Sequence, residues 1–137
     1  MSQNNNNKLL SISLVLYAIV CLVYGICYVF IPHVLVDLSG GEAIPSAWLR
    51  WSGCILVSLG IGAILVYRNP AKQDPFVITI ALGSLFTGLA LLYALVFELS
   101  GEFWFTALPM FITLLLSALL WWGRAQSKNI LNQDNKD

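Results

Sequence analysis

Charged side chains are scarce in this sequence of 137 residues: they make up 10% of it, whereas 58% of the residues are hydrophobic. A soluble domain of ordinary composition carries roughly a quarter charged residues. The seven basic and seven acidic residues balance one another, and no cluster of lysine and arginine offers a surface that neutralises nucleic-acid phosphates. The composition therefore predicts that the lipid bilayer surrounds most of the chain, and it excludes nucleic acid as a partner.

Sequence motifs of metal and nucleotide sites are also missing. The cysteines, Cys21, Cys27 and Cys54, lie inside apolar runs without CxxC spacing, and the chain has no HExxH pattern. We therefore predict no metal site and no catalytic residue, and we interpret the cysteines as packing residues. A disulfide between Cys27 and Cys54 stays open. GxGxxG and Walker patterns are absent, and the sequence identifies no cofactor.

Four long apolar runs dominate what is present. Each has roughly the 20 residues that a helix needs to cross the hydrocarbon core, where a helix satisfies all of its own backbone groups. We predict an all-α integral membrane four-helix bundle in one domain, with a disordered polar tail before it and a polar tail after it. The expected spans are residues 9–31, 47–67, 76–97 and 103–123, and the expected tails are residues 1–8 and 124–137.

The basic residues predict the orientation of these spans. Positive charge concentrates on the cytoplasmic side of membrane proteins. Antiparallel, up-down spans place all basic residues but Arg50 on one side, namely Lys8, Arg68, Lys72, Arg124, Lys128 and Lys136. We therefore expect a multi-pass protein with both termini in the cytoplasm.

Small residues mark where neighbouring helices approach one another, because association in lipid depends on close packing. The second span carries Gly53, Gly60 and Gly62, and the third carries Gly83 and Gly88. We interpret these five glycines as helix-packing residues and predict that the second and third spans pack tightly together. A leucine in place of Gly60 or Gly83 is then expected to disturb folding or assembly.

Tyrosines form a stripe along the first span, at Tyr17, Tyr24 and Tyr28. A phenol hydroxyl in hydrocarbon needs a partner, which is either a neighbouring group of the bundle or the polar head of a bound lipid or quinone. Arg50 and Glu98 stand at span ends on the outer side, where they either pair with each other or extend into the headgroups. These five residues are the candidate ligand-binding residues.

Several short stretches carry a family resemblance. They are Tyr24-Gly25 and Phe30-Ile31-Pro32 in the first run, and Leu49-Arg50-Trp51-Ser52-Gly53 and Leu59-Gly60-Ile61-Gly62 in the second. Together with the layout of four spans, they resemble small bacterial four-helix membrane proteins related to DoxX. The resemblance implies a bundle in the bacterial inner membrane, and some members are associated with oxidoreductase complexes or quinone-linked electron transfer. It transfers no catalytic residue.

Three classes of function remain open. The first is a non-enzymatic membrane protein that is an accessory subunit of another membrane protein, associates with a second copy, or binds lipid or quinone between its helices. The second is a small transporter or channel for a neutral or lipophilic solute; mid-span ionisable residues are lacking, which disfavours a proton-coupled pump. The third is a membrane enzyme, which would require His33, Asp37 and Glu98 to converge at the outer face.

Overall fold

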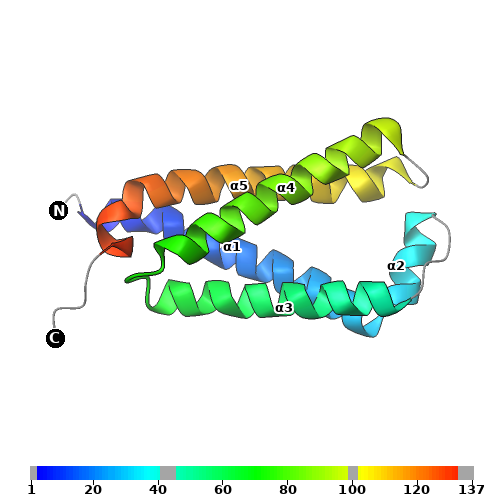
Figure 1. The fold of residues 1–137 in the computed structure, drawn as a ribbon, viewed down its shortest axis with the longest axis horizontal. Coiled ribbons are helices and arrows are strands. Elements are labelled where there is room, and N and C mark those ends of the chain that lie inside the picture. Colours follow the sequence, from blue (N-terminus) through cyan, green and yellow to red (C-terminus); the bar gives the residue numbers. More distant parts are fainter. Residues whose placement is uncertain (1–2, 41–45, 99–101, 133–137) are drawn as a thin grey trace.

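Helices make up nearly all of the described structure. A computed structural model of the chain describes residues 3–40, 46–98 and 102–132, without the side chains of residues 3–7 and 46. These parts contain five helices and no strand, which confirms the all-α prediction (Figure 1). The helices are α1 (Gln3–Phe30), α2 (Pro32–Ser39), α3 (Ser46–Arg68), α4 (Asp74–Phe97) and α5 (Phe103–Leu131).

Four of these helices, α1, α3, α4 and α5, are long and apolar enough to cross a membrane. The shortest candidate span, Ala47–Arg68, has 22 residues, or about 33 Å of helix, which exceeds the roughly 30 Å of hydrocarbon. Large apolar side chains cover the outside, and Phe30, Phe97 and Phe111 are 75%, 71% and 66% exposed. Soluble monomers rarely expose so much apolar surface. These features support a multi-pass membrane protein.

Two helix boundaries differ from the predicted ones by more than two residues. Helix α1 already begins at Gln3, inside the predicted N-terminal tail, and α5 continues to Leu131, beyond the predicted end at residue 123. An existing helix extends at low cost, because each added residue gains one backbone hydrogen bond, so polar residues can continue it. The sequence spacing of Leu120, Ser127 and Leu131, which places them on one face of a helix, was a signal for the longer α5. All three are buried in the structure.

The long helices are arranged as two packed pairs, α1 with α3 and α4 with α5. Helix α1 also packs on α5, so that the order of contacts is α3, α1, α5, α4. Among the described residues no extensive contact joins α3 to α4, and the prediction that these two helices pack tightly is wrong. Figure 1 shows the pairs close together at the end that holds the α3–α4 connection and farther apart at the end that holds α2.

Glycines bring α1 and α3 into backbone contact. A Cβ atom placed on Gly53 would lie 2.7 Å from the carbonyl oxygen of Gly25, and one on Gly25 would lie 2.9 Å from the carbonyl oxygen of Gly53. One on Gly60 would lie 3.0 Å from Leu22 and 3.3 Å from the carbonyl oxygen of Ala18. Gly53 and Gly60 are therefore helix-packing residues, as predicted, but the helix that they contact is α1.

The other three predicted packing glycines have different surroundings. A Cβ atom on Gly88 would meet Leu114 of α5 at 2.5 Å, and one on Gly62 would meet the ring of Phe76 of α4 at the same distance. A Cβ atom on Gly83 would meet no atom within 4 Å. The prediction that Gly83 packs against a neighbouring helix is wrong.

Polar contacts join the helices at the end that holds the α3–α4 connection, which we call the basic end. Ser13 of α1 donates a hydrogen bond to the carbonyl oxygen of Leu119 of α5, at 3.2 Å. The Nε and Nη2 atoms of Arg124 donate to the two carboxylate oxygens of Asp74, both at 2.7 Å. This bidentate pair joins α5 to the first turn of α4, where the helix dipole also favours a carboxylate.

The backbone contact between Gly25 and Gly53 generates the first prediction. A Gly53→Ala substitution should lower the free energy of unfolding by about 1–2 kcal/mol, because the new methyl group forces α1 and α3 apart. The matched control is Gly83→Ala, which has free space and should leave stability unchanged or raise it by up to about 1 kcal/mol. Thermal or denaturant unfolding in nanodiscs measures both; equal effects of the two substitutions would contradict the packing described.

The Arg124–Asp74 ion pair generates the second prediction. Asp74→Asn and Arg124→Gln should each lower the free energy of unfolding by about 1–2 kcal/mol, and the double variant should cost little more than either single one. Arg68→Gln is the control, because Arg68 is an exposed cation at the end of α3. Additive losses in the double variant would show that the pair does not couple α4 to α5.

Candidate functional site

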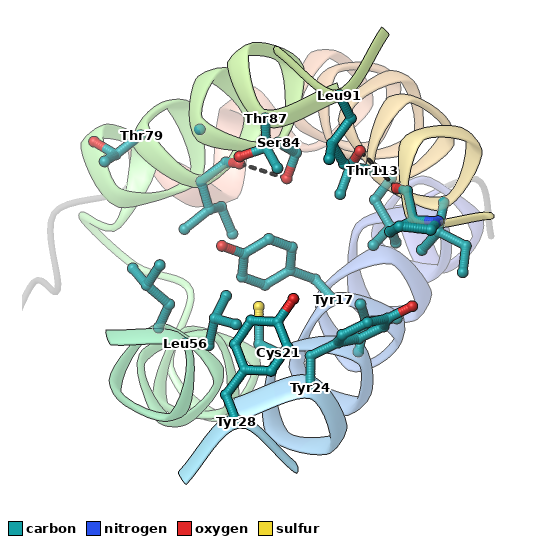
Figure 2. A pocket seen from close by; sticks show the side chains of 17 residues that line it. Tyr17, Cys21, Tyr24, Tyr28, Leu56, Thr79, Ser84, Thr87, Leu91 and Thr113 are labelled. Atoms are coloured by element: carbon teal, nitrogen blue, oxygen red, sulfur yellow. Dashed lines mark hydrogen bonds between the residues drawn. The ribbon is translucent and has the colours of Figure 1, made fainter. Parts of the chain in front are cut away.

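A cavity of about 370 Å³ lies between the four long helices. Seventeen residues line it, and they come from α1, α3, α4 and α5 (Figure 2). Most of the surface of this cavity wall is apolar, and its polar members are Tyr17, Cys21, Tyr24, Tyr28, Thr79, Ser84, Thr87 and Thr113. The cavity is the strongest candidate for a ligand site in the described part of the chain.

Helical periodicity explains how the tyrosine stripe reaches the cavity. Tyr17, Cys21, Tyr24 and Tyr28 follow one another at intervals of four, three and four residues, which places them on one face of α1. That face is turned to the cavity, and the three tyrosines named as candidate ligand-binding residues all belong to its wall. The structure thus brings together three of the five candidates.

Most of the smaller hydroxyl groups of the wall are already hydrogen-bonded to their own helices. Thr79 donates to the carbonyl oxygen of Pro75, Ser84 to that of Ile80 and Thr113 to that of Pro109, each at 2.8 Å. Serine and threonine in helices commonly donate to the carbonyl four residues earlier. These three hydroxyl groups are therefore left mainly as acceptors toward the cavity.

The tyrosine hydroxyls differ in their partners. Tyr17, which is 6% exposed, has the Cys21 thiol as a neighbour one turn further along α1. The rings of Tyr24 and Tyr28 meet edge to face, with centroids 6.1 Å apart, and neither hydroxyl has a hydrogen-bond partner among the described residues. Figure 2 shows the rings of Tyr17 and Tyr28 pointing into the cavity, while that of Tyr24 turns toward α5.

Arg50 and Glu98, the other two candidates, lie outside the cavity wall. Both are exposed, and within the described residues no ion pair joins them. Arg50 belongs to α3 and Glu98 directly follows α4, the two helices that fail to pack together. The order of helix contacts therefore explains why a pair between Arg50 and Glu98, one of the two alternatives left open, does not form. The cavity wall carries no charged side chain.

The cavity opens sideways, between α3 and α4. The wall residues Thr79, Gly83 and Thr87 of α4 are exposed on this side. Toward the basic end the opening is limited by the ring of Phe76, which lies against Gly62 of α3. At the opposite end α2 packs against α1, α3 and α5 and links the two helix pairs. The opening thus lies on the flank of the helices.

The outer-face residues form no compact site in the described parts of the chain. His33, Asp37, Glu98 and Glu102 are all exposed, and no group of three His, Cys, Asp or Glu side chains there is placed to hold a metal ion. Glu42 lies outside the described residues. All three cysteines have free thiols, so the disulfide left open between Cys27 and Cys54 is not formed.

No family model, curated protein or solved structure matches the chain. The resemblance to DoxX-related proteins therefore stays a prediction from short stretches of sequence. The case for a function consequently depends on the cavity, its wall and its opening.

The role of Gly83 as a wall residue was missed from the sequence, although the residues on α4 that surround it gave a signal. Thr79, Gly83 and Thr87 recur every four residues, and Gly83 was taken as a helix-contact residue, because small side chains permit close approach. Small side chains also leave space where no helix approaches. The same pattern fits either a contact or a cavity, and only the path of α3 distinguishes them.

Proposed function

We propose that this protein is an integral membrane four-helix bundle that binds an apolar molecule from the lipid bilayer in the cavity between its helices. The observation that carries this proposal is the side-opening cavity with its uncharged, mainly apolar wall. Its volume of about 370 Å³ lies in the range of small-molecule sites, which have mostly apolar walls and a few convergent polar groups.

The proposed orientation places the basic end of the bundle in the cytoplasm and the protein in a bacterial inner membrane. Figure 1 shows the start of α1, the α3–α4 connection and the end of α5 at the same end of the bundle. This arrangement supports the prediction that the basic residues lie on one side. Lys8, Arg68, Lys72, Arg124 and Lys128 belong to these segments, and Arg50 lies near the opposite end of α3. The positive-inside rule then makes the basic end cytoplasmic.

In this orientation the opening between α3 and α4 faces lipid. A molecule dissolved in the bilayer therefore reaches the cavity sideways, without crossing water. Transfer from lipid to an apolar cavity yields little hydrophobic free energy, because the acyl chains of the bilayer are equally apolar. Selection of one molecule over bulk lipid thus depends on cavity shape and on the few hydroxyl groups of the wall.

Binding accounts for the geometry better than passage across the membrane does. The cavity extends from Tyr28, near the α2 end, to Tyr17, and the helices beyond Tyr17 are joined by packing and polar contacts. Leu10 lies against Gly123, and Ser13 donates a hydrogen bond to the carbonyl oxygen of Leu119. A channel needs a path through this end of the bundle, whereas a binding site does not.

The space at Gly83 provides the test of the proposed function. Gly83→Leu should fill the cavity and abolish binding of methyl laurate, a single-chain ester, without loss of stability, because the new side chain enters free space. Binding is measured in phospholipid nanodiscs as the rise in melting temperature that a ligand of the folded state causes. Ala90→Leu is the matched control, since Ala90 is an exposed residue of α4 outside the cavity wall.

Three results would argue against the proposed site. One is a wild-type protein that methyl laurate does not stabilise, and another is a Gly83→Leu protein that it stabilises as strongly as the wild type. The third is equal loss of binding in Gly83→Leu and Ala90→Leu, which would place the ester on the outer surface.

A further inference from the structure

The hydroxyl of Tyr28 is a hydrogen-bond donor of the cavity wall that is left for a ligand. Its ring points into the cavity (Figure 2), and its hydroxyl has no partner among the described residues. Tyr17, by contrast, has the Cys21 thiol as a neighbour, and Ser84 and Thr113 donate to their own helices. A donor without a partner in an apolar environment carries a large desolvation cost, which a ligand acceptor removes.

The absence of charged side chains from the cavity wall limits which head group the ligand can have. No Lys, Arg, His, Asp or Glu side chain belongs to the seventeen lining residues. A phosphate, carboxylate or ammonium group buried there would lose its hydration with no opposite charge to replace it. The head that fits is therefore uncharged and offers an oxygen acceptor, as a carbonyl or ester group does.

The size of the cavity limits the apolar part. A volume of about 370 Å³ holds about a dozen water-sized groups at roughly 30 Å³ each, and a methylene group takes up nearly the same space. One chain of about a dozen carbon atoms, or a ring with a short chain, fills it. Two acyl chains do not fit together, and the remainder of a longer molecule would extend through the opening between α3 and α4.

We propose that the ligand is an uncharged molecule with one apolar chain, whose carbonyl or ester oxygen accepts a hydrogen bond from the hydroxyl of Tyr28. This inference rests on the proposed function, because it specifies what the same cavity holds. Two sources share this chemistry, a single-chain lipid ester and a quinone with an alkyl chain. The Tyr28 hydroxyl selects such molecules from the surrounding phospholipids, whose heads carry charge.

The test compares four probes by the shift in melting temperature of the protein in phospholipid nanodiscs. They are methyl laurate, a benzoquinone with a ten-carbon chain, dodecane, and laurate at a pH at which it is ionised. For the wild type, one or both carbonyl probes should bind at least about fivefold more tightly than dodecane or laurate, the contribution of one ordinary hydrogen bond. The carbonyl probe that binds more tightly identifies the source of the ligand, a lipid ester or a quinone.

Two matched variants assign the hydrogen bond. Tyr28→Phe should weaken the binding of the carbonyl probe about fivefold and leave the binding of dodecane unchanged, since only the hydroxyl is removed. Tyr93→Phe is the control, because Tyr93 is an exposed residue of α4 outside the cavity wall, and it should bind both probes as the wild type does. No effect of Tyr28→Phe, or an equal effect of Tyr93→Phe, overturns the assignment.

The two proposals fail in different ways. If dodecane or laurate binds as tightly as the carbonyl probes and Gly83→Leu abolishes this binding, the cavity is a ligand site but the inference about an uncharged acceptor is wrong. If Gly83→Leu leaves the shifts of all bound probes unchanged, or if no probe stabilises the wild type, the proposed function itself is wrong.

Discussion

The backbone contact between Gly25 of α1 and Gly53 of α3 is the constraint on which the rest of the arrangement depends. The carbonyl oxygen of each glycine occupies space that a side chain of the other would need. In lipid, where burial of apolar surface gives no advantage, such close packing is a main source of helix association. Because this contact packs α3 against α1, α3 does not cover the neighbouring face of α4. The cavity is the space that remains.

Contacts at the two ends keep that space from collapsing. At the basic end, the Arg124–Asp74 pair and the Ser13–Leu119 hydrogen bond tie α5 to α4 and to α1. At the other end, the backbone N–H of Glu102, just before α5, donates to the carbonyl oxygen of Ser39 in α2, at 2.7 Å. The two helix pairs are thus joined at both ends and separated between them, where the cavity lies.

The sequence predicted where the helices lie along the chain better than which helices pack against one another. The length of the apolar runs located the four long helices, and helical periodicity placed the tyrosine stripe of α1 on one face. Both properties depend only on residues that are close together in the sequence. The partner of α3 was not predictable in this way, since glycine spacing shows that a helix can be approached closely without showing by which helix. For the same reason Gly83 was assigned to a contact, and a pair between Arg50 and Glu98 was left open although α3 and α4 do not pack together.

The uncovered face of α4 also changes what counts as the boundary of this protein. A bundle that is closed on all sides has an interior independent of its surroundings, whereas here one side of the interior consists of whatever molecule lies between α3 and α4. Under the proposed function that molecule is drawn from the local lipid mixture, so the chain length and branching of those lipids would become part of the packing. The composition of the membrane would then complete the fold, and the same polypeptide would have a different interior in different membranes.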